Sequence, residues 1–440
     1  MSSSAQNNRI AESRRRFGAA RPLEHSPTSP DTSRQALESY LITGWIVPPF
    51  HIRTGYARPF VYQRPQVATS DQNDHRISLQ VLTHAVQARL LPAYQRIGIA
   101  LSGGLDSAAI AAICRQSLDR RNLVAFTLDF GPPWSDEVAV ARDICRLLDI
   151  PLYVVDASPR TVHEQLHKAT AAMVSPYGDA VCVPWFLLGK AASDAGCDAL
   201  LSGEGGDQVF GGWANKPMVS ELALTGASLE TIYGKTFHRF LDDIPEMLDA
   251  TRLLSTETRQ FDVHAWIQSC LPDEQDLSLL KLLRHLNFAT KGAGTILPRF
   301  TELVESHGID AHAPFFDTEL VGSVESLPDT AILDGATDKA LLRQIVAAMT
   351  SIDIATLPKR GMGVPSTYWC TGDHHLGVSV RRQLSSKNAH RDLRIRQEYK
   401  DKLLSGIVDA PDAYRKRRLG ERLWTLFQWE VFREVHSLSE

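Results

Sequence analysis

The stretch that decides the fold reads Arg96-Ile97-Gly98-Ile99-Ala100-Leu101-Ser102-Gly103-Gly104-Leu105-Asp106-Ser107. Its first six residues form a short apolar run, which predicts a buried β-strand. Two glycines then predict a tight turn, and residues 108–116 have the apolar spacing of a helix. Glycines let a backbone approach a ligand closely, and the free N–H groups at the start of a helix attract an anion. The stretch therefore predicts a phosphate-binding loop between a strand and a helix.

The polar side chains of this loop indicate which phosphate group it would bind. Ser102 and Ser107 can donate hydroxyl hydrogen bonds to phosphate. Asp106 would repel a bare phosphate, so its presence predicts Mg²⁺ between them. The Gly-Lys-Ser/Thr element of the Walker loop is missing. The alternative interpretation is a glycine-rich turn in which Asp106 merely caps the helix.

Strands alternate with helices on the carboxyl side of this loop. Apolar runs at residues 123–128, 152–155 and 199–201 alternate with helical patterns at 136–148 and 184–195. This alternation predicts an α/β fold, a parallel twisted sheet with helices on both faces, which binds ligands at the carboxyl ends of its strands. Further helical patterns occupy residues 35–45, 77–92, 277–288, 297–306, 338–349 and 420–434. The part beyond residue 215 is therefore predicted to be mostly helical.

Composition excludes several classes of protein. Residues 1–35 are rich in Ser, Asn, Gln, Arg and Pro, which is typical of a disordered tail. The net charge of −4 gives no reason to expect nucleic acid as a partner, and no apolar run is long enough to span a bilayer. The six cysteines lack metal-site spacing and form no disulfide framework. A cytoplasmic protein is expected.

A second glycine-rich loop follows the predicted strand at 199–201. It reads Ser202-Gly203-Glu204-Gly205-Gly206-Asp207-Gln208-Val209-Phe210-Gly211-Gly212-Trp213. It could be an irregular surface loop. It could also be a loop whose backbone wraps around a nucleotide, with Asp207 as a ligand of Mg²⁺ and Glu204 as a residue that takes part in the reaction.

The two loops resemble known motifs. The first matches the Ser-Gly-Gly-x-Asp-Ser pattern of the PP-loop ATP pyrophosphatases, and the second resembles the corresponding loop in the synthetase domain of the asparagine synthetase family. Further matches in the order of that family are Asp136-Glu137, Ala313-Pro314-Phe315-Phe316-Asp317, Lys339-Ala340-Leu341-Leu342-Arg343, Lys359-Arg360-Gly361-Met362-Gly363-Val364-Pro365, Leu423-Trp424 and Trp429. The resemblance covers residues 36–434. It divides the chain into a tail (1–35), an N-terminal helical segment (36–95) and an ATP-binding synthetase domain (96–440).

The resemblance implies ATP and Mg²⁺ as cofactors and a role for each matched residue. Asp106 and Asp207 would hold Mg²⁺, and Lys339, with Ser102 and Ser107, would contact the leaving pyrophosphate. Lys359 would neutralise charge as an amine attacks an acyl-adenylate, and Glu204 would deprotonate or position that amine. The remaining ATP-binding residues would be Leu101, Gly103, Gly104, Leu128, Gly203 and Gly205. Taken alone, either lysine would be read as a solvated charge, and no acidic partner of Glu204 can be identified.

The source of the amine is the open question. Asparagine synthetases of the usual type begin with a glutaminase domain whose N-terminal cysteine releases ammonia. Here Ser2 follows Met1 and the first cysteine is Cys114, so we expect no glutaminase activity in this chain. The amine would then be free ammonia, a small amine, or an amine within the substrate itself, as in the β-lactam-forming synthetases and lasso-peptide cyclases of this family. An internal amine has a high effective concentration.

The segment Arg299–Asp317 bears on the substrate. Asparagine synthetases tend to read Ser-Met-Ala where this chain has Glu302-Leu303-Val304, and they have Glu and Arg where it has Asp310 and His312. These departures favour a lasso-peptide cyclase, which closes a macrolactam ring between an Asp or Glu side chain and the N-terminal amine of a precursor peptide. A leader-binding protein and a maturation protease would be possible partners. The alternatives are an amide synthetase for a small metabolite and a non-catalytic nucleotide-binding subunit.

Overall fold

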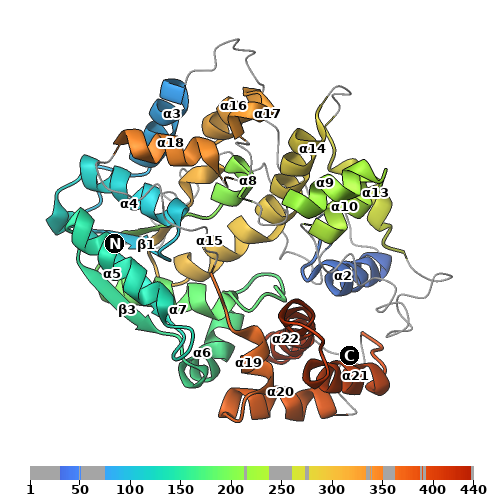
Figure 1. The fold of residues 1–440 in the computed structure, drawn as a ribbon. Coiled ribbons are helices and arrows are strands. Elements are labelled where there is room, and N and C mark those ends of the chain that lie inside the picture. Colours follow the sequence, from blue (N-terminus) through green and yellow to red (C-terminus); the bar gives the residue numbers. More distant parts are fainter. Residues whose placement is uncertain are drawn as a thin grey trace.

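The computed structural model describes residues 30–48, 50, 75–212, 216–236, 260–272, 277–332, 337, 339–349, 362–386, 389 and 393–437. Its centre is a five-stranded parallel sheet with the order β3-β2-β1-β4-β5 (Figure 1). The strands are β1 (Ile97–Ala100), β2 (Leu123–Asp129), β3 (Leu152–Asp156), β4 (Ala199–Leu201) and β5 (Asp310–His312). The predicted α/β class is confirmed, and the three apolar runs predicted after the first loop are all strands.

The helices cover both faces of this sheet. Helix α4 (Leu105–Ser117) connects β1 to β2, and α5 (Asp136–Leu148) connects β2 to β3. The chain then returns through α6 (Pro159–Ala171) and α7 (Cys182–Asp194) to β4, on the other side of β1. Because such crossovers are right-handed, this reversal puts α7 on the face opposite α4 and α5. Helix α15 (Leu297–Glu305) packs beside α7.

The reversal of direction between β1 and β4 determines where a ligand can bind. Neighbouring strands of a parallel sheet whose connections leave in opposite directions open a crevice at their carboxyl ends. The two glycine-rich loops follow β1 and β4, which are hydrogen-bonded neighbours in the sheet. The topology therefore brings the two loops together, although about a hundred residues separate them in the sequence.

Helices from both ends of the chain pack against each other. Helix α2 (Pro30–Thr43) begins five residues before the predicted helix, and Tyr40 in it stacks on Trp429 of α22 (Ala413–Val435), with ring centroids 5.0 Å apart. The Tyr40 hydroxyl donates to the carbonyl of Thr425 at 2.8 Å. Helix α22 is therefore a buried element that ties the N-terminal helix to the rest of the fold.

The remaining helices complete the fold. They are α3 (His75–Gln87), η1 (Arg120–Asn122), α8 (Gly206–Phe210), α9 (Lys216–Leu224), α10 (Leu229–Thr236), α13 (Val263–Ser269), α14 (Leu279–Asn287), the π-helix η2 (Phe288–Ile296), η3 (Pro314–Phe316), α16 (Thr318–Ser326), α17 (Asp329–Ile332), α18 (Ala340–Met349), α19 (Ser366–Thr371), α20 (His375–Ser385) and α21 (Gln397–Val408). A separate small core joins α10, α13 and α14. The mostly helical character predicted beyond residue 215 is confirmed; β5 and the π-helix were not predicted.

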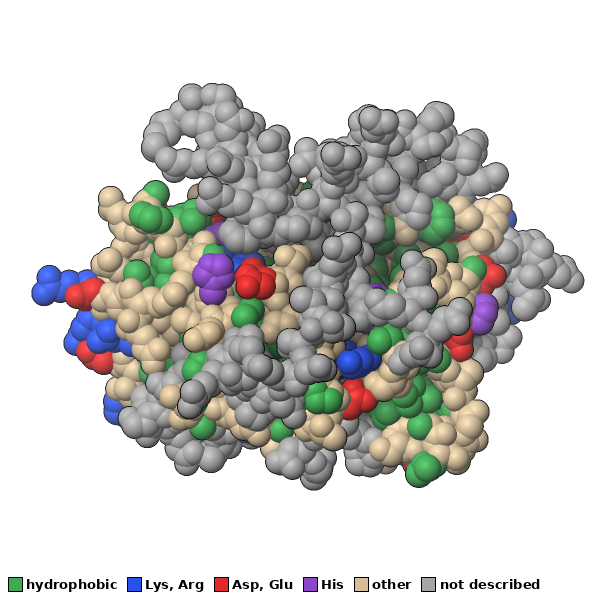
Figure 2. Space-filling model, turned by 90° about the horizontal axis from the view of Figure 1, so that it is seen from above, with side chains coloured by type: hydrophobic (Ala, Val, Ile, Leu, Met, Phe, Trp, Pro, Cys, Tyr) green, Lys and Arg blue, Asp and Glu red, His purple; other side chains and the backbone are tan. Residues whose placement is uncertain are grey.

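The surface of the described residues carries apolar and charged side chains in a mixed pattern. Figure 2 shows small, separate groups of hydrophobic side chains on one face, with acidic and basic side chains next to each other at its margin. Within the described part of the chain, none of the helices has the length and apolar character needed to cross a membrane.

Candidate active site

The first glycine-rich loop is shaped by its own serines. Gly103 has φ +74°, a left-handed conformation that favours glycine. The hydroxyl of Ser107 donates to the carbonyl of Gly104 at 3.1 Å and accepts from the backbone N–H of Ser102 at 3.2 Å. Gly104, which precedes α4, has no side chain to cap the helix, so the first N–H groups of α4 face the loop. This is the backbone arrangement that binds phosphate.

The second loop is in direct contact with the first. A Cβ atom added to Gly203 would lie 2.8 Å from the backbone nitrogen of Ser107, and one added to Gly206 would lie 2.5 Å from Cγ of Asp106. Real Cβ atoms do not approach other atoms so closely. Glycine is therefore needed at both positions to let the two loops pack.

We expect Gly206→Ala to displace the Asp106 carboxylate and to weaken Mg²⁺-ATP binding by about tenfold or more, because a misplaced ligand group loses much of its contribution. Isothermal calorimetry with a non-hydrolysable ATP analogue measures this effect. Gly406→Ala is the matched control: its Cβ would meet only a side-chain methyl of Leu419 at 3.4 Å, so nucleotide affinity should be unchanged. Equal affinity of both variants would contradict this packing role.

A buried lysine lies between the acids of the two loops. Lys339 has 1% exposure, and its Nζ is 2.7 Å from Oδ1 of Asp207 and also contacts the carboxylate of Asp106. Burial by itself lowers the pKa of this lysine, but the two carboxylates outweigh burial and raise the pKa above its usual value. The ammonium group therefore stays charged. Gly212 leaves room for it, since a Cβ there would lie 2.0 Å from Cε of Lys339.

Asp106 and Asp207 suit a magnesium ion. Both carboxylates contact the same nitrogen of Lys339, so their oxygens lie close together and share one focus of positive charge. Mg²⁺ typically takes one or two carboxylates and completes its octahedron with phosphate oxygens and water. Within the described residues no group of three or more His, Cys, Asp or Glu side chains could hold a metal. Two carboxylates beside a phosphate-binding loop are a donor set that Mg²⁺ could share with a nucleotide.

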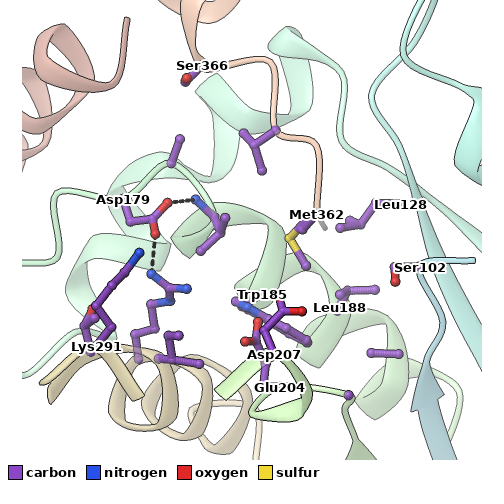
Figure 3. Close-up of a pocket in the computed structure, with 18 of the residues that line it drawn as sticks. Ser102, Leu128, Asp179, Trp185, Leu188, Glu204, Asp207, Lys291, Met362 and Ser366 are labelled. Atoms are coloured by element: carbon purple, nitrogen blue, oxygen red, sulfur yellow. Dashed lines mark hydrogen bonds and ion pairs between the residues drawn. The ribbon is translucent and has the colours of Figure 1, made fainter. Parts of the chain in front are cut away.

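These residues line a cavity of about 390 Å³ at the carboxyl edge of the sheet. In Figure 3, Ser102 and Leu128 lie at one end, Asp179 and Lys291 at the other, and Glu204 and Asp207 between them. Most of the predicted site residues line it: Leu101, Ser102, Asp106, Ser107, Leu128, Gly203, Glu204, Gly205 and Asp207. Gly103 and Gly104 shape the first loop, and Lys339 contacts the acids of both loops. Lys359 lies outside the described residues.

Glu204 has an electrostatic environment unlike that of an exposed carboxylate. Burial raises the pKa of Glu204 to about 7, against the lowering effect of Arg299, and the carboxylates of Asp207, Asp179 and Asp106 raise it further. A carboxyl group with a pKa near neutrality can accept and release a proton under ordinary conditions.

The far end of the cavity, which we call the acceptor lobe, contains charges that were not predicted. It contains Asp179, its ion-pair partner Arg299, and Lys291 (Figure 3). Outside the two glycine-rich loops the cavity lining also includes Thr43, Gly44, Trp45, Gly178, Ala180, Val181, Thr295, Ile296, Arg417, Glu421 and Trp424. Arg299 is buried and forms an ion pair with Asp179. One indication of this region was present in the sequence: Arg299 is the first residue of the segment 299–317, which departs from asparagine synthetases. Asp179 carried no signal.

Other predicted segments take different places. Asp310 and His312 do not line the cavity; both interact with the hydroxyl of Tyr94, at 2.5 and 2.9 Å. The departures from asparagine synthetases at these two positions therefore lie in β5 itself, in part-buried contacts with Tyr94. Glu302 accepts hydrogen bonds from the Tyr177 hydroxyl and the Val174 N–H, each at 3.0 Å. Glu302 thus joins α15 to the segment before α7, and it is absent from the cavity lining.

The acidic pair and a basic run near the C-terminus also have defined positions. Glu137, at the start of α5, lines the cavity and accepts from the N–H of Gly363 at 3.4 Å. It thereby contacts the segment that follows Lys359 in the sequence. A basic run such as 415–418 is usually exposed to solvent. Here it lies in the first turns of α22, and part of it is not exposed. Arg418 is buried, and Arg417 lines the cavity with its Nε 2.8 Å from Glu421.

Comparison with known proteins identifies the family of this chain. The sequence pattern of the family described as asparagine synthase matches residues 78–434, which is most of the chain. The chain belongs to the asparagine synthase family. It is 22% identical over 370 residues to glutamine-hydrolysing asparagine synthetase 1 of Bacillus subtilis, covering 78% of this chain and 56% of that protein. It is 24% identical over 428 residues to a putative asparagine synthetase of Mycobacterium bovis, covering 88% and 62%.

The chain thus carries an asparagine-synthetase-like amide ligase domain and spans about 60% of the length of these relatives. Solved structures with local similarity include the NH₃-dependent NAD synthetase of Campylobacter jejuni, with 12% identity and a TM-score of 0.27, covering 51% of this chain and 98% of that one. NMN synthetase of Francisella tularensis matches with 13% identity and a TM-score of 0.25, covering 53% and 94%.

Proposed function

We propose that this chain is an ATP-dependent amide ligase that adenylates a carboxylate, releases pyrophosphate and transfers the acyl group to an amine. The observation that carries the proposal is the convergence of two glycine-rich loops on Lys339, with Asp106 and Asp207 on either side of its ammonium group. A positively charged pocket for pyrophosphate beside a two-carboxylate site for Mg²⁺ is what cleavage between the α and β phosphates requires.

The nucleotide would occupy the end of the cavity next to β1 and β2. Leu101 and Leu128 lie at the carboxyl ends of these two strands and offer apolar contact to the base. The serines and the N–H groups of the first loop would bind the phosphates, and Asp106 and Asp207 would hold Mg²⁺, whose chemistry is to neutralise charge on the triphosphate. Lys339 would then stay with the pyrophosphate as it leaves.

The amide would form in two balanced steps. An oxygen of the substrate carboxylate attacks the α phosphorus, and the bond to the bridging oxygen breaks with release of pyrophosphate. The amine nitrogen then attacks the acyl carbon, AMP departs with the bonding electron pair, and the amine proton passes to Glu204. A base of pKa about 7 suits this last step.

For the substrate, we propose a precursor peptide whose Asp or Glu side chain is joined to its own N-terminal amine, as in a lasso-peptide cyclase. In support, the cavity lining is not limited to the two glycine-rich loops and includes Trp45 and Arg417. The cavity thus offers contacts to parts of a substrate other than the reacting groups. A leader-binding protein and a maturation protease would be the partners of such an enzyme.

A second candidate is an amide synthetase that uses ammonia or a small amine on a small metabolite. It is favoured by the relatives, which are described as asparagine synthetases. For the domain organisation we propose an N-terminal segment (36–95) that forms one unit with the ATP-binding part (96–440), because α2 bonds to α22. The tail would end before Pro30, since α2 begins there and the predicted boundary at residue 35 falls inside this helix.

Pyrophosphate release tests the ligase proposal and separates its two forms. The purified chain is incubated with Mg²⁺-ATP and either free aspartate plus ammonium or a synthetic peptide with an N-terminal glycine and an internal aspartate. Loss of one water from the peptide, with equimolar AMP, supports the macrolactam. Asparagine formation supports the second candidate. Absence of Mg²⁺-dependent AMP with every carboxylate would contradict both.

The pH dependence of amide formation tests the role of Glu204. A general base must be ionised, so the rate should rise as the pH increases through about 7, the pKa of Glu204. Glu204→Gln should lower the rate of amide formation about 100-fold and remove this rise. ATP–pyrophosphate exchange, which precedes the amine, should persist. A variant that keeps the rising limb would show that another group is the base.

Lys359→Ala separates adenylation from amide formation. If Lys359 stabilises charge only as the amine attacks, the variant should keep ATP–pyrophosphate exchange but form amide about 100-fold more slowly. Lys402→Ala, a substitution in α21 outside the cavity lining, is the control. Full product yield from Lys359→Ala would exclude the proposed role.

A further inference from the structure

The acceptor lobe contains a carboxylate that combines accessibility with rigid support. The Asp179 side chain is 48% exposed, whereas the side chain of its ion-pair partner Arg299 is 7% exposed. Asp179 lines the cavity, and in Figure 3 it lies on the far side of Glu204 and Asp207 from Ser102. A group that enters the cavity from this side therefore meets the carboxylate of Asp179 and not the buried guanidinium behind it.

The loop that carries Asp179 is held from both ends of the chain. The N–H of Gly178 donates to the carbonyl of Gly44 at 2.7 Å, and the Thr425 hydroxyl donates to the carbonyl of Gly178 at 3.0 Å. The N–H of Val181 donates to Oδ1 of Asp179 at 3.2 Å, and Arg299 takes the other oxygen. Each oxygen has further lone pairs, so the carboxylate can accept another hydrogen bond without losing these.

Asp179 and Glu204 share the cavity but differ in protonation. Partial shielding from water inside the cavity raises the pKa of Asp179, but Arg299, the Val181 N–H and Lys291 outweigh this effect and hold that pKa below its usual range. Glu204 faces Arg299 too, but burial, with Asp207, Asp179 and Asp106, raises its pKa to about 7. Two carboxyl groups whose surroundings drive their pKa values apart have distinct tasks, one as a fixed anion and one as a proton acceptor.

We propose that Asp179 is the docking site for the ammonium group of the incoming amine, with Glu204 as the acceptor of its proton. The inference rests on the proposed function and supplies the acidic partner of Glu204. One N–H of the ammonium group hydrogen-bonds to Asp179, and another loses its proton to the ionised Glu204. The nitrogen lone pair thus freed attacks the acyl carbon of the adenylate. AMP departs with the bonding electron pair, and its phosphate takes the second proton that the nitrogen loses as the amide forms, while Asp179 stays ionised throughout. The ligand class is a primary alkylammonium, such as a peptide N-terminus.

The test uses two small probes of nearly equal shape. Glycinamide is a cation near neutral pH and resembles a peptide N-terminus, whereas glycolamide has a neutral hydroxyl in place of the ammonium. Saturation-transfer NMR measures the affinity of each for the full chain with Mg²⁺ and α,β-methylene-ATP. The wild-type protein should bind glycinamide about tenfold more tightly, the effect of one hydrogen bond to a charged group. Asp179→Asn should abolish this preference.

Asp179→Asn leaves Arg299 buried without its partner and could unfold the chain. The double variant Asp179→Asn with Arg299→Gln removes both charges and should also lose the preference for glycinamide. Asp194→Asn, at the exposed end of α7, removes one charge elsewhere and should keep it. Equal binding of the probes by the wild-type protein, or an unchanged preference in the folded variants, would overturn the proposal. If the wild-type protein prefers glycinamide but adenylates no carboxylate, the ligase proposal is wrong and the proposed ammonium site at Asp179 still stands.

Discussion

Asp106→Asn is expected to lower the formation of AMP and pyrophosphate by at least about 1,000-fold, because a metal ligand at the triphosphate stabilises the transition state by several kcal/mol. Asparagine has nearly the shape of aspartate, so the contact with Gly206 and the packing of the two loops should be kept. What the variant loses is the charge that attracts Mg²⁺ and pairs with Lys339. The effect should therefore appear in catalysis far more than in folding.

The measurement compares nucleotide binding with turnover. Calorimetry should show that Asp106→Asn still binds the nucleotide without metal and that Mg²⁺ no longer strengthens binding. Asp129→Asn is the matched control. Asp129 also ends a central strand, but it does not line the cavity, and it accepts hydrogen bonds from the Gly131 N–H and the Ser135 hydroxyl, which an amide oxygen can still accept. An Asp106→Asn enzyme with turnover within tenfold of wild type would mean that Mg²⁺ is held elsewhere.

Local sequence was sufficient to predict the part of this site that lies on the strands and the loops that follow them. A run such as residues 96–101 is too apolar to be anything but buried, and Ser-Gly-Gly before a helical pattern leaves few conformations. Because parallel strands end at one edge, two such loops must lie near each other once their strands are neighbours. That is why the loops that carry Ser102, Asp106, Glu204 and Asp207 could be expected at one edge of the sheet, whereas the roles of these residues were inferred from the resemblance to the asparagine synthetase family.

The acceptor lobe could not be predicted in this way, because its contacts join distant residues. Asp179 and Arg299 are 120 positions apart, and neither stands in a motif. Their pairing depends on α15 packing against α7, which in turn depends on which face of the sheet each helix covers. The π-helix at Phe288–Ile296, which presents Lys291 to the cavity, has no periodicity that would separate it from an α-helix. The residues that bind and activate the nucleotide stand in local motifs, whereas those that would recognise the substrate do not.

Lys339→Met is expected to destabilise the protein by about 3–5 kcal/mol, because it leaves the carboxylates of Asp106 and Asp207 close together without their shared cation. In the wild-type protein the pKa of Lys339 is raised above its value of 10.5 in the unfolded chain. Its contribution to stability is therefore fully present below pH 10.5 and is lost only as the pH rises through the higher folded-state pKa. Near neutral pH, Lys339→Met should therefore lose the whole contribution that Lys339 makes to the free energy of unfolding.

The variant should also respond to Mg²⁺ and to acid in ways that the wild type does not. Two carboxylates that no longer contact Lys339 form a stronger cation site, so Mg²⁺ should raise the unfolding temperature of Lys339→Met by more than that of the wild type. Repulsion raises the pKa of both acids in the folded variant. Lowering the pH should therefore recover part of the lost stability, as one of them becomes protonated. Catalysis should fall by about 1,000-fold, since pyrophosphate loses its positive partner.

Lys400→Met is the matched control, because it removes another buried lysine that does not contact carboxylates of the proposed metal site. Lys400 also has 1% exposure, but its Nζ donates to the carbonyl oxygens of Ser386 and Ala389, at 3.0 and 3.5 Å. Burial lowers the pKa of Lys400, against the raising effect of Glu430, whereas the pKa of Lys339 is raised. Loss of Lys400 should thus cost less stability and create no Mg²⁺ effect. If both variants respond to Mg²⁺ alike, the carboxylates beside Lys339 are not the metal site, and the Asp106→Asn result would have to be explained by charge alone.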